Sequence, residues 1–334
     1  MSNLYYTGDP LKRRADGPAA LPGSRRRRQT DPAGYRPDPG LVDAVNVALL
    51  LNQPLLLTGE PGTGKTQLAY SVAWELNLGR VLIFETKSSS SARDLFYSYD
   101  TLGRFHAAQS REGSGASLEY MTWNALGEAI LQSRPRAQVG AWLPKNFAHD
   151  GPRRSVALID EIDKAPRDFP NDLLNEIEHM YFRVPELGNA RIPAEDDPGS
   201  ADMRPILILT SNSEKNLPEA FLRRCVFYHI PFPDPARLTD IVMQRVGGFE
   251  NSDNKLLKDA VGLFVMLREP GSGLRKKPAT AELIAWLTAL TAMHVPADQP
   301  LSQSRDKALS TLGALVKNAE DQEAARLLVE KYLR

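Results

Sequence analysis

The sequence is poor in the residues that build disulfide frameworks and metal sites. Cys225 is the one cysteine among 334 residues, which excludes an internal disulfide and fits a reducing compartment. The five histidines are scattered, without a paired cysteine or an E-x-x-H partner, which argues against a transition-metal site. No stretch reaches the roughly 18 apolar residues of a membrane helix, and the first ten residues lack the apolar centre of a signal peptide. We therefore expect a cytoplasmic protein with no membrane segment.

The chain also lacks an excess of charge of either sign, since its 41 Lys and Arg residues balance its 41 Asp and Glu residues. This balance gives no overall attraction to nucleic acid or to an anionic membrane. A hydrophobic content of 42% and a charged content of 25% are those of an ordinary globular protein. The length suits two domains better than one.

Residues 1–40 differ in composition from the rest of the chain. They are crowded with Pro and Gly, contain the run Arg25–Arg28, and carry eight basic residues against four acidic ones. Such a segment has too little apolar surface to offset the entropy that is lost when it is ordered. We predict a flexible basic tail over residues 1–34. The alternative is a basic arm that binds nucleic acid or an acidic partner.

From residue 40 onwards, short apolar runs alternate with helical patterns. The apolar runs predict strands at residues 55–58, 81–84, 156–159, 206–210 and 226–230. The helical spacing of apolar residues predicts helices at 41–51, 66–76 and 171–180. This alternation indicates an α/β domain over residues 35–233 with a mainly parallel five-stranded sheet.

No strand pattern recurs after the proline-rich stretch at 231–235. Helices are predicted instead at 235–246, 253–269, 280–294 and 304–334, the last of them broken near Ala319. Asp234 and Thr280 are suited to cap the first and third of these helices. The sequence thus predicts an all-helical domain over residues 234–334.

A glycine-rich segment follows the first predicted strand and fits the pattern G-x-x-x-x-G-K-S/T. It reads Gly59-Glu60-Pro61-Gly62-Thr63-Gly64-Lys65-Thr66, with Gln67 next. Glycines at 62 and 64 can adopt positive φ, so that successive N–H groups surround phosphate oxygens, and the following helix presents its positive N-terminus to the same anion. Lys65 is expected to reach the β- and γ-phosphates, and the Thr66 hydroxyl to bind Mg²⁺. Residues 59–66 are therefore predicted to form a nucleotide-binding phosphate loop.

A second polar signal ends the predicted strand at 156–159, where Asp160 and Glu161 follow four apolar residues. Asp160 is expected to hold Mg²⁺, directly or through water. Glu161 is the candidate that orients and deprotonates an attacking water. Two acids at these positions favour hydrolysis of the nucleotide over binding alone.

These two motifs at this separation resemble the AAA+ superfamily of P-loop NTPases, and finer details resemble its MoxR-type, dynein-related group. Residues 160–166 read D-E-I-D-K-A-P and resemble the MoxR pattern D-E-I-N/D-R/K-A-P. Residues 217–224 read L-P-E-A-F-L-R-R and resemble the segment L-P-E-A-x-x-D/E-R-F. The resemblance implies an AAA+ core followed by a helical lid, with ATP and Mg²⁺ as the cofactors.

By this resemblance, Asn212 matches sensor 1, a side chain that holds the catalytic water near the γ-phosphate. Arg224 matches the arginine finger, which reaches the γ-phosphate in a neighbouring subunit. Arg223 stands where the family usually has an acid, so it remains the alternative finger. The arginine of sensor 2 is replaced by Ala279, and Lys277 is the substitute that we favour from the basic turn at 275–277.

An arginine that acts in trans implies a homo-oligomer, expected to be a hexameric ring. The resemblance further implies a chaperone or remodelling motor whose protein partner carries a von Willebrand factor A-type domain. It also implies that inserts at 95–118 and 187–204 form hairpins facing the pore or a partner, although ordinary packing would explain their aromatic residues equally well. Two other functions stay open: a nucleic-acid-directed motor of the restriction or defence type, and an ATP-dependent switch with little turnover.

The basic tail provides a test of the nucleic-acid alternative. A motor that acts on a protein partner predicts no DNA binding by the tail, even at low salt. A DNA-directed motor predicts a mobility shift that weakens as salt is raised from ~50 to ~200 mM, because phosphate contacts release counterions. We expect electrophoresis with duplex DNA to show no shift that depends on residues 1–34. A salt-sensitive shift that is lost on deleting those residues would establish the alternative.

Overall fold

The computed structural model describes residues 32–110, 117–144, 147–194, 203–212 and 217–334. These residues divide into two units, one from Tyr35 to Phe232 and one from Pro233 to Arg334 together with the short turn Pro32–Gly34. The predicted tail lies almost entirely outside the described residues, as do parts of the two predicted inserts. Within the described residues, no helix combines the length and the apolar character that crossing a membrane requires.

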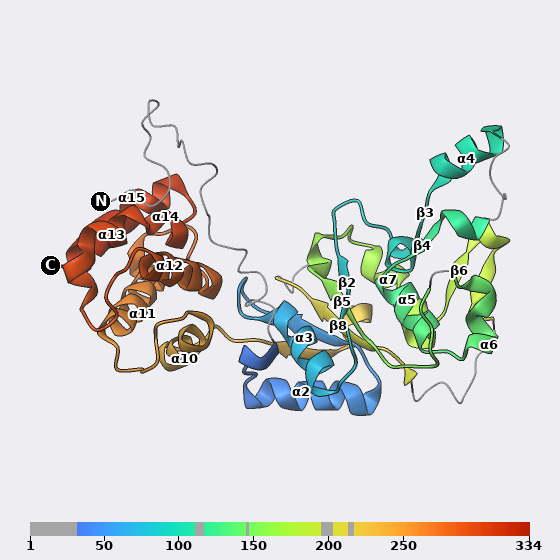
Figure 1. The fold of residues 1–334 in the computed structure, drawn as a ribbon, viewed down its shortest axis with the longest axis horizontal. Helices are drawn as coiled ribbons and strands as arrows, with labels where there is room; N and C mark the ends of the chain where they lie inside the picture. The colour runs from blue at the N-terminus through green and yellow to red at the C-terminus, as the bar shows by residue number, and fades with distance from the viewer. Residues whose placement is uncertain (1–31, 111–116, 145–146, 195–202, 213–216) are drawn as a thin grey trace, which may run out of the picture. The chain divides into compact units, whose positions relative to one another are not determined.

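Five parallel strands form the centre of the unit from Tyr35 to Phe232 (Figure 1). They are β1 (Leu55–Thr58), β2 (Leu82–Glu85), β5 (Val156–Asp160), β8 (Ile206–Thr210) and β9 (Val226–His229). Their order across the sheet is β2-β5-β8-β1-β9, so β8 lies between β1 and β5. In the register of the sheet, Ile159 is the partner of Leu209, and Leu57 is the partner of Thr210. The predicted five-stranded sheet is confirmed, with strand ends shifted by at most one residue.

Alternate residues of the central strands point to opposite faces of the sheet. On β5, Leu158 belongs to the core cluster that includes α2 (Pro39–Leu51) and α3 (Lys65–Glu75). The next residue, Ile159, belongs to the cluster that includes α5 (Ala125–Gln132). Helices therefore cover both faces, which explains why these strands are apolar throughout instead of alternating with polar residues.

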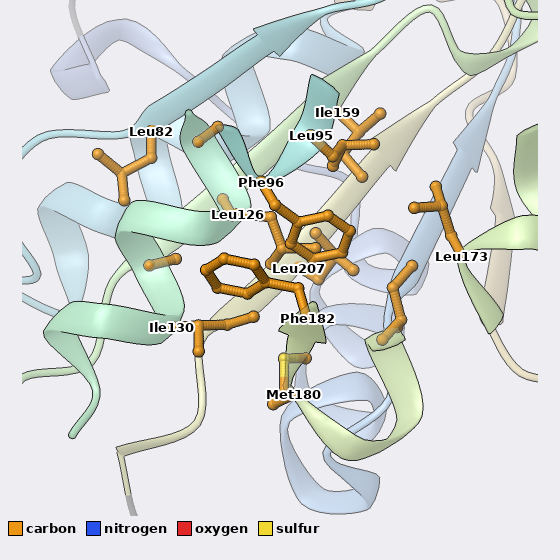
Figure 2. Close-up of a cluster of buried hydrophobic side chains, with 14 of the residues drawn as sticks. Leu82, Leu95, Phe96, Leu126, Ile130, Ile159, Leu173, Met180, Phe182 and Leu207 are labelled. Carbon is orange, nitrogen blue, oxygen red and sulfur yellow. The ribbon is translucent and has the colours of Figure 1, made fainter. Parts of the chain in front are cut away.

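Two antiparallel hairpins lie outside the main sheet. They pair β3 (Tyr97–Tyr99) with β4 (Met121–Trp123), and β6 (Phe182–Val184) with β7 (Ala190–Ile192). Phe182 joins them, because its ring stacks on Phe96 with centroids 5.0 Å apart and meets Trp123 edge-on at 5.6 Å. Figure 2 shows Phe96 and Phe182 side by side in a core that also contains Leu126 and Ile130. The two hairpins thus share one aromatic core.

The aromatic residues of the first predicted insert divide between core and surface. Tyr97 is fully buried, so ordinary packing accounts for it. Between the two strands of this hairpin lies α4 (Thr101–Ser110), on which Leu102 is 71% exposed and Phe105 57% exposed. The helix therefore presents apolar side chains to solvent.

Most helix ends lie within about two residues of the predicted ones, but the predictions are wrong in three places. The segment 304–318, predicted as one helix, is divided at Thr311 into α13 (Arg305–Ser310) and α14 (Leu312–Leu315). The helix predicted at 171–180 is two short helices, α7 (Phe169–Asp172) and α8 (Leu174–His179). Leu173 separates them with φ −94° and ψ −10°, and its side chain is fully buried in the core. The prediction that Thr280 caps its helix is wrong: the cap is Ala279, whose N–H donates to Glu282 Oε2 at 3.1 Å.

The unit that begins at Pro233 contains helices and no strands in its described residues. Its α-helices are α10 (Pro235–Arg245), α11 (Lys255–Arg268), α12 (Thr280–Ala292), α13 (Arg305–Ser310), α14 (Leu312–Leu315) and α15 (Ala319–Tyr332). Asp234 caps α10 as predicted, since its side chain accepts the N–H of Arg237 at 2.8 Å. The predicted break near Ala319 is confirmed by the start of α15. The unit from Tyr35 to Phe232 also contains two short helices, α6 (Arg136–Val139) and α9 (Glu219–Leu222).

We expect Phe182→Ala to destabilise the protein more than any substitution on the exposed face of α4. The substitution removes the ring that joins the two hairpins and leaves a cavity, which costs about 3–5 kcal/mol of the free energy of unfolding. Leu102→Ala serves as the control and should change it by less than about 0.5 kcal/mol, since Leu102 lies at the surface. Urea denaturation followed by tryptophan fluorescence measures both. Equal losses for the two variants would contradict the shared aromatic core.

Candidate phosphate-binding and hydrolytic site

The phosphate loop connects the end of β1 to the start of α3. Three of its glycines have positive φ, 142° at Gly59, 80° at Gly62 and 93° at Gly64. A Cβ at Gly64 would lie 3.0 Å from the ring of Tyr35, and one at Gly59 would lie 2.7 Å from the backbone oxygen of Ile230. The positive φ predicted at positions 62 and 64 is confirmed. A side chain at position 59 or 64 would strain the loop twice, through its backbone and through these contacts.

Lys65 is the buried cation of the phosphate loop, with 6% of its surface exposed. Its ammonium group donates to the backbone oxygens of Gly59 at 2.7 Å and of Glu60 at 3.0 Å. Burial lowers the pKa of Lys65 from its ordinary value. The carboxylates that surround it oppose this shift, and they belong to Asp160, Asp163, Glu161 and Glu60. The lysine charge is therefore tethered to the loop within an acidic neighbourhood.

The start of α3 is suited to bind an anion. Its N-cap is Gly64, which has no side chain to satisfy the N–H groups of the first turn. The turn before it is closed by Thr63, whose hydroxyl donates to the backbone oxygen of Glu60 at 2.9 Å. The helix of eleven residues concentrates positive partial charge at this end. A phosphate group held by the loop would thus meet backbone N–H groups and the helix dipole together.

Asp160 ends β5 and is hydrogen-bonded to the first turn of α3. The hydroxyl of Thr66 donates to Asp160 Oδ1 at 2.9 Å, and Oδ2 lies 3.3 Å away. A hydroxyl and a carboxylate are oxygen ligands of the kind that Mg²⁺ prefers, and Mg²⁺ usually keeps water and substrate phosphates as its other ligands. No group of three or more His, Cys, Asp or Glu residues that could hold a metal occurs in the part of the chain that the structure describes. The donor set fits a magnesium ion that is bound together with a nucleotide.

Glu161 has a left-handed backbone conformation, with φ 56° and ψ 51°. This conformation costs a residue with a Cβ roughly 1–2 kcal/mol, and such strain gathers at functional sites. Its carboxylate accepts from Asn212 Nδ2 at 3.2 Å and forms an ion pair with Lys164. Asn212 is fixed in turn by Asp163, whose Oδ1 accepts its backbone N–H at 3.2 Å. The structure therefore brings the predicted catalytic acid and the predicted sensor 1 residue into contact.

Thr210 is a member of the site that we did not predict from the sequence. It ends β8, is fully buried, and its hydroxyl lies 2.6 Å from Asp160 Oδ1 and 2.8 Å from the backbone nitrogen of Glu161. The signal in the sequence is that Thr210, like Asp160, is the polar residue that ends an apolar strand. We name the following six residues the strand-end cluster: Lys65, Thr66, Asp160, Glu161, Thr210 and Asn212.

The two candidate finger arginines have partners outside this cluster. Arg224 donates to Glu178 at 3.3 Å and to the backbone oxygen of Ala220 at 3.1 Å, and 48% of its side chain is exposed. Arg223 forms an exposed ion pair with Glu219. None of these partners belongs to the strand-end cluster, which agrees with a residue that acts on the site of a neighbouring subunit.

The basic turn at 275–277 precedes α12 in the helical unit. The buried carboxylate of Asp321 accepts the backbone N–H groups of Arg275 at 2.9 Å and of Lys276 at 3.0 Å. The side chain of Arg275 forms an ion pair with Glu320, whereas Lys277 is exposed. The turn has a fixed backbone, and the assignment of Lys277 as the sensor 2 substitute stays a prediction.

The chain is similar to known proteins through a family model and, at low identity, through solved structures. In the solved structures, the chain resembles the RuvB Holliday junction branch migration motor of Thermotoga maritima, with 16% identity, a TM-score of 0.42, and coverage of 85% of this chain and 69% of that chain. It also resembles a chain from a structure on katanin self-assembly, with 12% identity, a TM-score of 0.41, and coverage of 94% and 99%. A search of curated proteins found no match. A family model for the AAA domain of the dynein-related subfamily matches residues 54–225, more than half of the 334 residues, and the chain therefore belongs to this AAA family.

Proposed function

We propose that this protein hydrolyses ATP with Mg²⁺ and uses the cycle to remodel a protein partner. The strand-end cluster is the observation that supports hydrolysis most directly. It contains a hydrogen-bonded pair suited to hold magnesium, Thr66 and Asp160, and a second hydrogen-bonded pair suited to orient water, Glu161 and Asn212. A protein that only binds nucleotide needs the first pair but has no use for the second.

Bound magnesium ATP supplies the phosphoanhydride bond and the cation that neutralises charge on its phosphate oxygens. The backbone N–H groups of residues 59–66 other than Pro61, together with the N-terminus of α3, bind the phosphate chain, with Gln67 in the same first turn. Lys65 adds its ammonium charge, and Thr66 with Asp160 holds the magnesium. Glu161 accepts a proton from the attacking water, while Asn212 fixes the carboxylate that does so.

Assembly into a ring is the second part of the proposal. Arg224 is exposed and lacks a partner in the strand-end cluster of its own chain, which supports a role at the site of a neighbouring subunit. We propose a homo-oligomer, hexameric by resemblance to the MoxR group, with Lys277 as the substitute for the sensor 2 arginine. The same resemblance supports a partner with a von Willebrand factor A-type domain. A pull-down with Glu161→Gln, a variant expected to bind ATP without hydrolysing it, would search for this partner directly.

Substitutions of Glu161 and Lys65 should separate hydrolysis from binding. We expect Glu161→Gln to keep its affinity for ATP within about threefold and to lose about 10²-fold or more of the hydrolysis rate, since general-base catalysis contributes this much. We expect Lys65→Ala to weaken binding itself, because it removes the buried cation of the loop. Calorimetry with magnesium ATP and a phosphate-release assay measure the two quantities. A wild-type rate no higher than that of Glu161→Gln would show that the protein is a switch.

Arg224 should act in trans. We expect Arg224→Ala to bind ATP normally but to hydrolyse it on the order of 10³-fold more slowly, the smaller of the effects known for such arginines. Mixing this variant with Lys65→Ala should restore part of the activity, because an intact Arg224 then faces an intact loop. Arg223→Ala is the matched control and should have little effect, since its ion pair with Glu219 is exposed. A full hydrolysis rate in isolated monomers, with a silent Arg224→Ala, would exclude the ring mechanism.

A further inference from the structure

Thr210 occupies the centre of the strand-end cluster because of the strand order. The phosphate loop follows β1, Asp160 ends β5 with Glu161 directly after it, and β8 separates these two strands. Thr210 is the last residue of β8, and none of its surface is exposed. Its backbone therefore lies between the two parts of the site, and its buried hydroxyl contacts the β5 part, at Asp160 and Glu161.

The chemistry of the hydroxyl fixes the direction of both of its hydrogen bonds. The backbone N–H of Glu161 can only donate, so at 2.8 Å the Thr210 oxygen must accept. The one proton of the hydroxyl is then left for Asp160 Oδ1, which lies 2.6 Å away. A single hydroxyl thus orients the carboxylate suited to hold magnesium and, at the same time, the backbone of the residue suited to activate water.

Both of these neighbours need support from elsewhere in the protein. Glu161 has the left-handed backbone that side chains disfavour, and the bond to Thr210 stabilises this conformation. Asp160 Oδ1 also accepts from Thr66, the other residue assigned to magnesium. The bond from Thr210 does not depend on Thr66, so it can keep Asp160 in place when the Thr66 hydroxyl turns to a cation.

We propose that Thr210 is a positioning residue, which couples the magnesium-holding carboxylate of Asp160 to the water-activating Glu161 through one buried hydroxyl. This role rests on the proposed hydrolysis of ATP. It differs from a purely structural bond in what it controls: the loss of the hydroxyl should change both the magnesium requirement and the turnover, and not only the stability of the fold.

The test is Thr210→Val, which keeps the shape of the side chain and removes the hydroxyl. We expect kcat to fall by about 10- to 100-fold and the magnesium concentration for half-maximal rate to rise by about tenfold, in line with the loss of outer-shell partners of metal ligands. The KM for ATP at saturating magnesium should change by less than about threefold, because the phosphate loop is intact. Thr210→Ser keeps the hydroxyl and should restore most of both parameters. If the valine variant does not fold, Thr210→Cys, with its weak S–H donor, takes its place.

Thr311→Val is the matched control for stability. The Thr311 hydroxyl also accepts from an N–H, that of Trp286 Nε1 at 2.9 Å, and donates to a backbone oxygen, that of Lys307 at 2.7 Å. Thr311 lies in the helical unit. The Thr311→Val variant should therefore be less stable than the wild type but need the same magnesium concentration for half-maximal rate.

The outcomes separate this proposal from the proposed function. Two results would overturn the positioning role. One is that Thr210→Val has the same kinetics as Thr311→Val, and the other is that Thr210→Ser is as impaired as Thr210→Val. If the wild type binds magnesium ATP without hydrolysing it, the proposed hydrolysis fails. The magnesium dependence of nucleotide binding in Thr210→Val then decides the role of Thr210: a tenfold shift supports it, and an unchanged titration overturns it.

Discussion

The position of β8 between β1 and β5 is the constraint on which the site depends. In a parallel sheet all strands end at the same edge, so the phosphate loop and the acidic pair open to the same side. Neighbouring strands are about 4.8 Å apart, which separates β1 and β5 by roughly 10 Å. The first turn of α3 reaches Asp160 through the Thr66 hydroxyl, and Thr210, at the end of the strand between them, donates to the same carboxylate. A residue at this position must be small enough to fit and must supply a proton to Asp160, and threonine does both.

The parts of the fold that could be predicted are those that local sequence determines. The central strands could be predicted because both of their faces are buried, so each is a short, continuous apolar run. The strands of the two hairpins have three residues each, too few to give a periodic signal. They are held by contacts between residues distant in the chain, above all those of Phe182 with Phe96 and Trp123. Leu173, with φ −94° and ψ −10°, likewise divides a segment whose sequence predicts a single helix.

Site residues that belong to one continuous sequence motif could be predicted. Site residues that come together only through the pairing of strands could not. The glycines, Lys65 and Thr66 are fixed by the spacing of one continuous segment, and Asp160 and Glu161 by the end of one strand. Thr210 lies 50 residues after Asp160 in the chain, and its role becomes visible only when the strand pairing is known. The left-handed backbone of Glu161 is also invisible in the sequence, because no glycine or asparagine marks it.

The charges of the site explain why the nucleotide should bind as its magnesium complex. One ammonium group, that of Lys65, lies among four carboxylates, whose charges partly oppose the lowering of its pKa by burial. Without a ligand the neighbourhood is therefore more negative than positive, and the partial charge of about half a unit at the start of α3 does not reverse this. A free triphosphate would be repelled by these acids. Thr66 and Asp160 would hold a divalent cation that offsets this negative charge, so the acidic residues that would exclude the free nucleotide would favour the metal complex.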